Sequence, residues 1–214
     1  MDLPFTHDQF LDVFSAYNEA VWPVALLLWL LTVAMLVLAL SGRGNKRSAR
    51  WIAIILVVHW AWSGFVYHLV YFRPINPAAT IFGALFVIEA GLIGWRGLIA
   101  RQLNFGASSK GWFRIGIMFV VYALLYPALG LVFGLSYPRL PSFGVPCPTT
   151  ILTVGALLML PRSDARIVTL IPILWTAVGG SAAFVLGIQA DLLLPVAGAL
   201  MLAYVVLPSR PHSA

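Results

Sequence analysis

The sequence predicts an all-α membrane protein, a polytopic bundle of seven transmembrane helices that forms a single domain over residues 1–214. Hydrophobic residues make up 61% of the chain, charged residues make up 9%, and apolar runs of about 20 residues recur along it. A soluble domain carries about 25% charged residues, so this chain has too little charge to cover a surface in water. The composition therefore excludes a soluble enzyme, a disordered chain and a nucleic-acid-binding protein, although the net charge is +6.

Seven apolar stretches define the predicted helices. They cover residues 20–41, 50–72, 77–99, 112–135, 147–160, 166–187 and 190–208. The fifth stretch is shorter than the roughly 20 residues that a span requires, and Pro161 ends it. We therefore expect the fifth helix to begin below the membrane surface.

The basic residues predict how the bundle is oriented. Eleven of the 13 Lys and Arg residues fall on one side: Arg43, Lys46, Arg47, Arg50, Arg96, Arg101, Lys110, Arg114, Arg162, Arg166 and Arg210. Only Arg73 and Arg139 fall on the other side. Because basic loops stay in the cytoplasm, we expect the N-terminus outside and the C-terminus inside, as an odd number of spans requires. Five acidic residues are expected on the outer side: Asp2, Asp8, Asp12, Glu19 and Asp191. Glu89 is then the one carboxylate expected within a span.

Residues 7–20 are expected to form a short helix on the outer membrane surface, before the chain turns inward at Trp22-Pro23. Thr6 and Gln9 have the spacing of a capping box, and Phe5 can pack on Phe10 beside it. No cleavable signal peptide is expected, because these residues contain neither Lys nor Arg. Apolar residues recur every three or four positions, opposite Asp8 and Asp12, which is typical of a helix lying in an interface: Phe10, Val13, Phe14 and Tyr17.

Ionisable side chains inside spans are the first candidates for function, because burying each one is costly unless it is paired. His59 lies about 12 Å beyond Trp51 at the inner boundary, and Glu89 lies about 18 Å from Pro77 at the outer boundary. In a bilayer core of roughly 30 Å these two positions have the same depth. A proton-handling His-Glu pair and a structural polar clamp between two helices both fit this arrangement.

Three further candidates, Tyr67, His68 and Asn76, lie near the outer ends of the second and third spans. His68 follows His59 by nine residues, which places it on the opposite helix face, so the two cannot bind one ligand. An interfacial aromatic belt is the alternative explanation for Tyr67. Asn76 followed by Pro77 is also typical of a helix start.

Residues 137–150 contain prolines at positions 138, 141, 146 and 148 and are still largely apolar. Non-helical backbone at membrane depth must be buried in protein or line a cavity. We expect a re-entrant outer loop that either lines a cavity or plugs it, with the hydroxyls of Thr149 and Thr150 beside a recessed helix N-terminus as ligands for an anion or a carbonyl. Cys147 is the only cysteine, and a buried apolar thiol is the alternative to a ligand.

The sequence contains no motif for a cofactor or a metal. A nucleotide-binding glycine loop, a metalloprotease His-Glu pattern and a Ser-His-Asp set are all absent from it. Its two lysines, Lys46 and Lys110, are expected in inner loops, where neither could form a retinal Schiff base. We therefore expect neither a cofactor nor a metal.

Four segments resemble a family of uncharacterised bacterial integral membrane proteins of this size. The segments are Tyr67-His68-Leu69, Ile75-Asn76-Pro77-Ala78-Ala79, Phe143-Gly144-Val145-Pro146-Cys147-Pro148-Thr149-Thr150 and Gly179-Gly180-Ser181-Ala182-Ala183-Phe184. The likeness covers nearly the whole chain. It implies a multi-pass protein of the bacterial inner membrane and transfers no catalytic residue.

The leading functional hypothesis is a small-solute or ion transporter, or a channel-like permease. Its outward-facing cavity would be roofed by the 137–150 loop, with His59 and Glu89 as the proton or gate element. An integral membrane enzyme or lipid-modifying protein is the second hypothesis, and a non-catalytic assembly or sensor subunit is the third. Expected partners are membrane lipids and a small solute or ion, and a homo-oligomer is compatible with the sequence. The candidate cavity residues are Tyr67, His68, Asn76, Cys147, Thr149 and Thr150.

Overall fold

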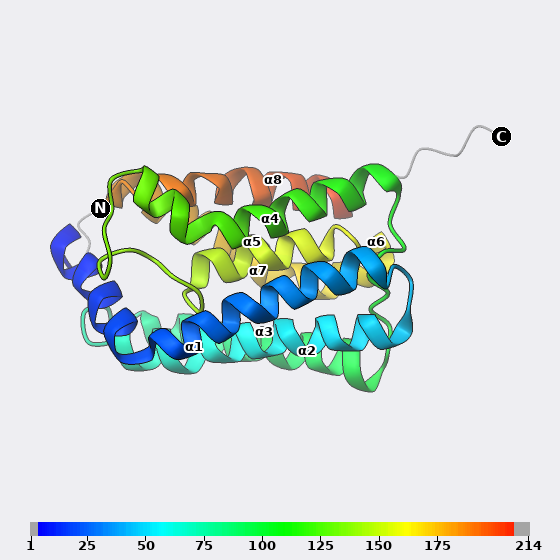
Figure 1. The fold of residues 1–214 in the computed structure, drawn as a ribbon, viewed down its shortest axis with the longest axis horizontal. Coiled ribbons are helices and arrows are strands. Elements are labelled where there is room, and N and C mark those ends of the chain that lie inside the picture. The colour runs from blue at the N-terminus through cyan, green and yellow to red at the C-terminus, as the bar shows by residue number, and fades with distance from the viewer. Residues whose placement is uncertain (1–3, 208–214) are drawn as a thin grey trace.

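The computed structural model describes residues 4–207, in which helices run along an elongated bundle and no strand occurs (Figure 1). Six helical stretches are long and apolar enough to cross a membrane, and another is shorter. The elements are α1 (His7–Ser41), α2 (Lys46–Trp62) continued by η1 (Ser63–Phe72), α3 (Ala79–Gly94) continued by η2 (Trp95–Ile99), α4 (Lys110–Val132), α5 (Pro146–Leu157), α6 (Arg162–Ala165) with η3 (Arg166–Thr169) and α7 (Leu170–Leu186), and η4 (Gln189–Leu192) with α8 (Leu193–Val206). The all-α prediction is confirmed. Asp2, Arg210 and the end of the last predicted helix lie outside the described residues.

α1 combines the predicted surface helix and the first predicted span in one element. Its capping box is present, since the Thr6 N–H donates to Gln9 Oε1 over 2.8 Å and the Gln9 N–H donates to Thr6 Oγ1 over 3.2 Å. The helix bends at Val21, where φ is −123° and ψ is 17°. Pro23 explains the bend, because it cannot donate to the carbonyl of Glu19 and its ring crowds that carbonyl. The part before the bend therefore covers one end of the bundle (Figure 1).

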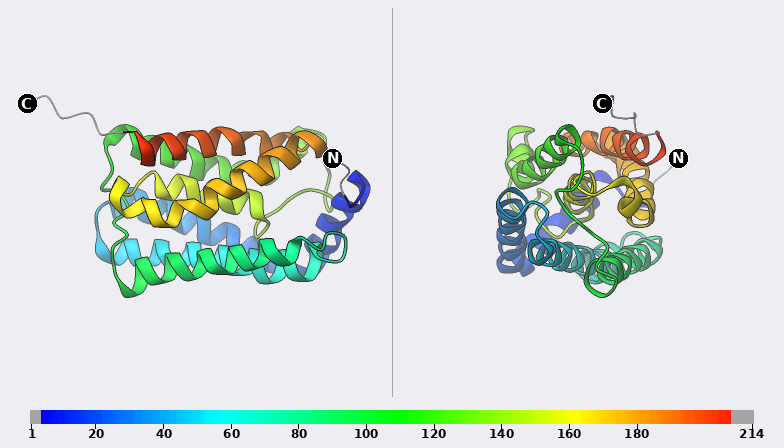
Figure 2. Two further views of the ribbon diagram at one scale, coloured as in Figure 1. Left: turned by 180° about the vertical axis from the view of Figure 1, so that it is seen from behind. Right: turned by 90° about the vertical axis from the view of Figure 1, so that its right-hand side faces the viewer.

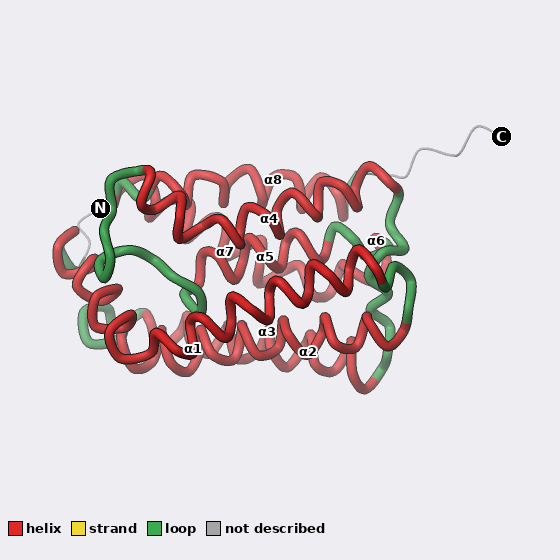
Figure 3. The backbone as a smooth tube through the Cα atoms, in the orientation of Figure 1, coloured by secondary structure: helices red, strands yellow, loops and turns green. Residues whose placement is uncertain are grey.

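α5 is the short helix at the centre of the bundle. It starts partway along the long axis, after the extended loop 133–145 (Figure 3), and it contacts α2, α4, α7 and α8. Every residue from 148 to 160 is buried. Because protein surrounds this helix on all sides, it does not need the length that a lipid-exposed span requires.

Small residues allow the helices to approach closely around α5. A Cβ atom on Gly116 of α4 would lie 2.5 Å from the carbonyl oxygen of Gly155, and a Cβ on Gly155 would lie 2.7 Å from the carbonyl oxygen of Gly116. Only glycine fits at these two positions, so α4 and α5 touch through their backbones. Figure 2 shows the bundle from behind and end-on, with the outer helices arranged around this central helix.

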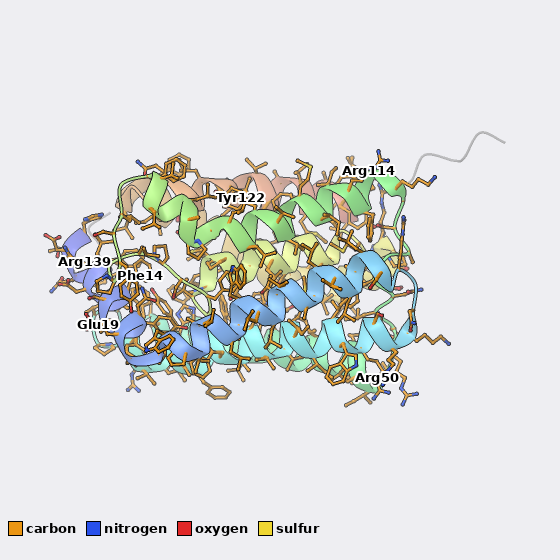
Figure 4. The ribbon with its side chains drawn as sticks, viewed as in Figure 1. Phe14, Glu19, Arg50, Arg114, Tyr122 and Arg139 are labelled. Atoms are coloured by element: carbon orange, nitrogen blue, oxygen red, sulfur yellow. The ribbon has the colours of Figure 1, made fainter. Side chains whose placement is uncertain are left out.

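The two ends of the bundle differ in charge, as the sequence predicts (Figure 4). Glu19 and Arg139, both labelled in Figure 4, lie at the end formed by the start of α1 and loop 133–145, called the cavity end below. Asp8 and Asp12 pair with Arg139 there, and Arg73 follows η1 at the same end. The other end, called the basic end, includes Arg50 and Arg114, which Figure 4 labels. From the bounds of the elements, it carries ten basic residues of the described chain: Arg43, Lys46, Arg47, Arg50, Arg96, Arg101, Lys110, Arg114, Arg162 and Arg166.

Candidate functional site

A cavity of about 260 Å³ lies at the cavity end, between the start of α1, η1, the start of α3, loop 133–145 and α7. Val185 on its wall is 64% exposed, so the cavity reaches the surface of the bundle beside the last turns of α7. An apolar pocket with a few converging polar groups is the usual form of a small-molecule site. Most of the wall is aliphatic or aromatic, and the side chains with polar atoms are Tyr67, His68, Asn76, Tyr126, Cys147, Trp175, Ser181 and Asp191.

His68 is the polar residue of this wall with the most unusual surroundings. Its side chain is fully buried, yet neither ring nitrogen has a hydrogen-bond partner within residues 4–207. It lies in η1, a π-helical segment. Such segments are rare in proteins, and those that occur are often found at functional sites. A buried polar group without a partner costs about 1–3 kcal/mol, so these nitrogens are well placed to bind a ligand. Five rings surround the imidazole, with centroids between 4.8 and 6.2 Å away: Tyr67, Phe72, Phe82, Phe86 and Trp175.

Asp191 is a second buried carboxylate in addition to Glu89, and its burial was not predicted from the sequence, where it is expected outside the spans. Gly187 ends α7, which favours an outer loop for the residues that follow, but η4 turns Asp191 inward and leaves it only 5% exposed. The Tyr126 hydroxyl donates to its carboxylate, and Cys147 lines the same cavity as this carboxylate. The sequence signal for this burial is the run of mostly apolar residues from 188 to 194.

Cys147, the second residue of α5, lies on the cavity wall, which Trp175 and Asp191 also line. Gly179 of α7, which has no Cβ, allows the Trp175 indole and the Cys147 thiol to pack closely against this helix. A Cβ atom on Gly179 would lie 3.2 Å from Trp175 Nε1 and 3.6 Å from Cys147 Sγ. The thiol therefore has polar neighbours, which differs from the buried apolar environment that the sequence left open as its alternative.

Loop 133–145 is tied to α1 by hydrogen bonds. Asn18 Nδ2 donates to the carbonyl oxygens of Pro138 and Leu140, each over 2.7 Å, and the Tyr17 hydroxyl donates to the carbonyl of Phe143 over 2.8 Å. At the surface, Arg139 pairs with Asp12 over 2.8 Å and with Asp8 over 3.2 Å. The bent start of α1 and the loop therefore form one unit.

Loop 133–145 lines the cavity with some of its residues and fills the bundle next to the cavity with others. The loop therefore has features of both alternatives from the sequence, a loop that lines a cavity and a loop that plugs it. Pro141 and Val145 belong to the cavity wall, whereas the Phe143 ring lies 6.2 Å from the His59 ring. Gly144 makes the sharp turn between them, with φ at 88°, where a Cβ atom would lie 2.2 Å from the Tyr17 hydroxyl oxygen.

The predicted His59-Glu89 pair does not form. His59 Nδ1 lies 2.8 Å from the carbonyl oxygen of Ile55, to which it donates, and Nε2 lies 3.1 Å from Thr32 Oγ1 of α1. Glu89 is buried, and neither carboxyl oxygen has a hydrogen-bond partner within residues 4–207. The depth argument does not specify the rotation of each helix about its axis, and α2 turns His59 toward α1 instead of α3. Neither residue lines the cavity.

Thr149 and Thr150 are buried in α5 and do not line the cavity either, which corrects the predicted anion or carbonyl site. The Thr150 hydroxyl donates to the carbonyl of Pro146 over 2.9 Å. Two of the first three residues of α5 are prolines, Pro146 and Pro148, which have no N–H. The recessed helix N-terminus therefore offers a single N–H from these three residues, that of Cys147.

The structure brings four of the six predicted cavity residues to one cavity: Tyr67, His68, Asn76 and Cys147. Tyr67 stacks on Phe14 of α1, with ring centroids 6.1 Å apart. Asn76 Oδ1 accepts the Ala78 N–H over 3.1 Å, and it caps the turn that leads into α3. Among residues 4–207, no group of three His, Cys, Asp or Glu side chains is placed to hold a metal ion.

These features define an all-helical protein in which six long apolar helices enclose a short central helix and an apolar cavity with buried polar groups. The chain belongs to a family of unknown function, DUF6064, whose model matches residues 7–213. The comparisons with curated proteins and with solved structures give no match.

Proposed function

We propose that the protein is a multi-pass protein of the bacterial inner membrane, with seven membrane helices, the N-terminus outside and the C-terminus in the cytoplasm. Six long apolar helices support the membrane location, and the concentration of Lys and Arg at one end supports the orientation. In this arrangement the cavity opens in the outer half of the membrane. Loop 133–145 and α5 then form a re-entrant segment that protein shields from lipid.

We further propose that the cavity binds a small amphiphilic molecule dissolved in the outer half of the membrane, and that the protein acts on this molecule as a lipid-modifying enzyme or binding protein. The observation that carries this proposal is the fully buried His68 on the cavity wall, with no partner for either nitrogen in the described chain. An apolar wall accommodates the hydrocarbon part of such a ligand, and His68 supplies a hydrogen bond to its polar group. In an enzyme, the same imidazole would be the acid or base.

The charged residues on the cavity wall limit which polar group the ligand can carry. Within residues 4–207, Asp191 lines the cavity and no Lys or Arg does. A ligand anion would have to leave water without a cation to pair with, in a site where the buried carboxylate of Asp191 repels it. We therefore expect an uncharged polar group, such as a hydroxyl or carbonyl, with an amine as the next best fit.

A small-solute permease is the second candidate. The cavity lies at one end of the bundle, and the buried residues 148–160 separate it from the other end. A transporter that works by alternating access has this form in the conformation that is closed on the inner side, so the geometry favours a permease. The apolar wall weighs against this candidate, because predominantly apolar molecules cross a bilayer without a protein. The His-Glu pair that motivated a proton-coupled transporter no longer supports it, since the pair does not form.

Binding is tested by isothermal titration calorimetry on the purified protein in detergent micelles. Octanol, 2-octanone, octylammonium and octanoate share a chain length and differ in the polar group. We expect binding of octanol and 2-octanone, weaker binding of octylammonium and the weakest binding of octanoate. Ala182→Trp places a large side chain on the cavity wall and should abolish the heat of binding, whereas Ala177→Trp, at an exposed position of the same helix, should not.

Octanoate binding as tightly as octanol would contradict the ligand class, and equal binding by the Ala182→Trp variant would contradict the location. The activity is tested separately by incubating the wild-type protein and a His68→Leu variant with bacterial lipid extract and comparing the lipids by mass spectrometry. A lipid species altered by the wild type alone would support the enzyme. Flux of a polar solute into proteoliposomes, lost in Ala182→Trp, would favour the permease instead.

A further inference from the structure

We propose that a second concavity, at the basic end, binds the phosphate headgroup of an anionic phospholipid. It has a volume of about 360 Å³ and lies between the start of α2 and the chain that follows η2. It is separate from the cavity at the other end and shares no residue with it. Four basic side chains and one amide line it: Lys46, Arg47, Arg50, Arg101 and Asn104.

The position of these basic residues is electrostatically unfavourable without an anion. Lys46 and Arg47 stand in the first turn of α2, and Arg50 follows in the next. The N-terminus of a helix carries a partial positive charge, so it normally attracts acids and repels basic side chains. The first turn of α2 contains no acid, and the ion pairs within residues 4–207 all involve Arg139 at the far end of the bundle. A bound phosphate would compensate both the side chains and the helix dipole.

Two other basic residues at the same end, Arg43 and Arg162, have intramolecular hydrogen-bond partners. The Arg43 guanidinium donates to the carbonyl oxygens of Gly106 and Ser108, over 2.8 and 3.2 Å. The Arg162 guanidinium donates to the carbonyl of Leu207. In the described chain the side chains of the four basic residues at the concavity make no such bond. Membrane orientation explains why basic residues gather at this end, but it does not explain why four of them converge on one hollow.

The backbone brings the two parts of the concavity together. A Cβ atom on Gly97 would lie 2.5 Å from the Cβ of Ala53, so η2 and α2 touch directly beside it. Arg101 then adopts a φ of 56°, a left-handed conformation that is uncommon for a residue with a side chain. This turn takes the chain past the start of α2 and places Arg101 and Asn104 on the wall. Such costly conformations persist where the surrounding structure requires them, and they cluster at functional sites.

The level of the concavity in the bundle points to a lipid rather than to free phosphate. Trp51, directly after Arg50, is 50% exposed, and Trp95 in η2 is 49% exposed. Exposed tryptophans of this kind mark the headgroup level of a membrane, and exposed Ile99 continues the apolar surface beside them. Basic pockets between membrane helices at this level bind anionic lipid headgroups. This inference rests on the proposed membrane insertion but not on the ligand proposed for the cavity.

The test uses the full-length protein reconstituted into phosphatidylcholine vesicles that contain either spin-labelled phosphatidylglycerol or spin-labelled phosphatidylcholine. Electron paramagnetic resonance measures the fraction of each label immobilised by the protein. We expect a clear preference for phosphatidylglycerol in the wild type. The double variant Arg47→Gln/Arg101→Gln should lower that preference about fivefold for each charge removed, or about twenty-five-fold in total.

The matched control is Arg114→Gln/Arg166→Gln, which removes the same charge from the same end without touching the concavity. It should retain most of the preference. An equal loss in both double variants would overturn the proposal, because general surface charge would then account for the binding. Displacement of the labelled lipid by inorganic phosphate at constant ionic strength would show that the concavity takes free phosphate, and it would overturn the choice of a lipid. Octanol titration on the same samples tests the ligand proposed for the cavity separately, so a failure of the phospholipid proposal can be told apart from a failure of the cavity proposal.

Discussion

His59 and His68 are two buried histidines nine residues apart on one continuous helix, and both are 0% exposed. His59 has a partner for each ring nitrogen, the carbonyl of Ile55 and the hydroxyl of Thr32. His68 has none within the described residues and lies on the wall of a cavity. Burial and residue type are the same, so the partners alone separate a structural histidine from a candidate ligand-binding one.

The local backbone contributes to this difference. His59 lies in the regular part of α2, where the carbonyl four residues earlier is within reach of its Nδ1. His68 lies in the π-helical segment η1, where its ring is directed into a group of aromatic side chains. Aromatic rings provide close packing but no conventional hydrogen-bond acceptor for an imidazole N–H. The wide helical turn and the aromatic pocket together leave His68 available to a ligand.

The strongest test of the comparison is His68→Leu. Loss of the polar contact should weaken octanol binding by up to about tenfold, because a neutral hydrogen bond contributes about 0.5–1.5 kcal/mol. The same change should raise the free energy of unfolding by about 1–3 kcal/mol, since it removes an unpartnered buried polar group. Calorimetry and denaturant unfolding in mixed micelles measure the two quantities. Lower stability with unchanged binding would make His68 a structural residue.

The matched substitution His59→Leu should have the opposite effect on stability. It removes two hydrogen bonds of about 1 kcal/mol each, so the free energy of unfolding should fall by about 2 kcal/mol. Octanol affinity should stay within about twofold of the wild type, because His59 is not on the cavity wall. The comparison of the two histidines fails if the same unfolding and binding measurements give both variants the same sign of stability change.

Thr32→Val tests the same contact from α1. The valine has nearly the shape of threonine but cannot interact with His59 Nε2, which then lies buried without its partner. We expect the free energy of unfolding to fall by about 1 kcal/mol in the same assay. Combined with His59→Leu, the second change should add little, because His59→Leu already removes the Thr32–His59 contact. Fully additive effects would show that the two side chains are not coupled.

The smallest effect is expected from Glu89→Gln. The Glu89 carboxyl group is buried without a partner in the described chain, and an amide of the same shape would take the same place. The free energy of unfolding should therefore change by no more than about 0.5 kcal/mol. Octanol binding and any solute flux should be unchanged. A large loss of flux with intact binding would restore Glu89 to the mechanism and would require a conformation in which it meets a partner.

Local patterns in the sequence predict a large part of this molecule. Hydropathy locates the helices, the spacing of Thr6 and Gln9 predicts the first cap, and the prolines around α5 predict its late start. These features depend on residues close together in the chain and on the contrast between apolar and polar side chains. Both can be read from the sequence alone. Four of the predicted ligand residues also meet at one cavity, because all of them come from the ends of elements that the charge pattern places together.

The sequence alone determined the helical class, the separation of charge between the two ends and a short set of polar candidates. Only the tertiary structure decided which of those candidates meet. Helices that are apolar on nearly every side carry no pattern that specifies their rotation, so counting residues gives the depth of His59 and Glu89 but not the faces they present. The separation of His59 from Glu89 follows from that rotation, and the inward turn of Asp191 toward Tyr126 follows from the packing of η4 against α4. Both are set by contacts between residues far apart in the chain.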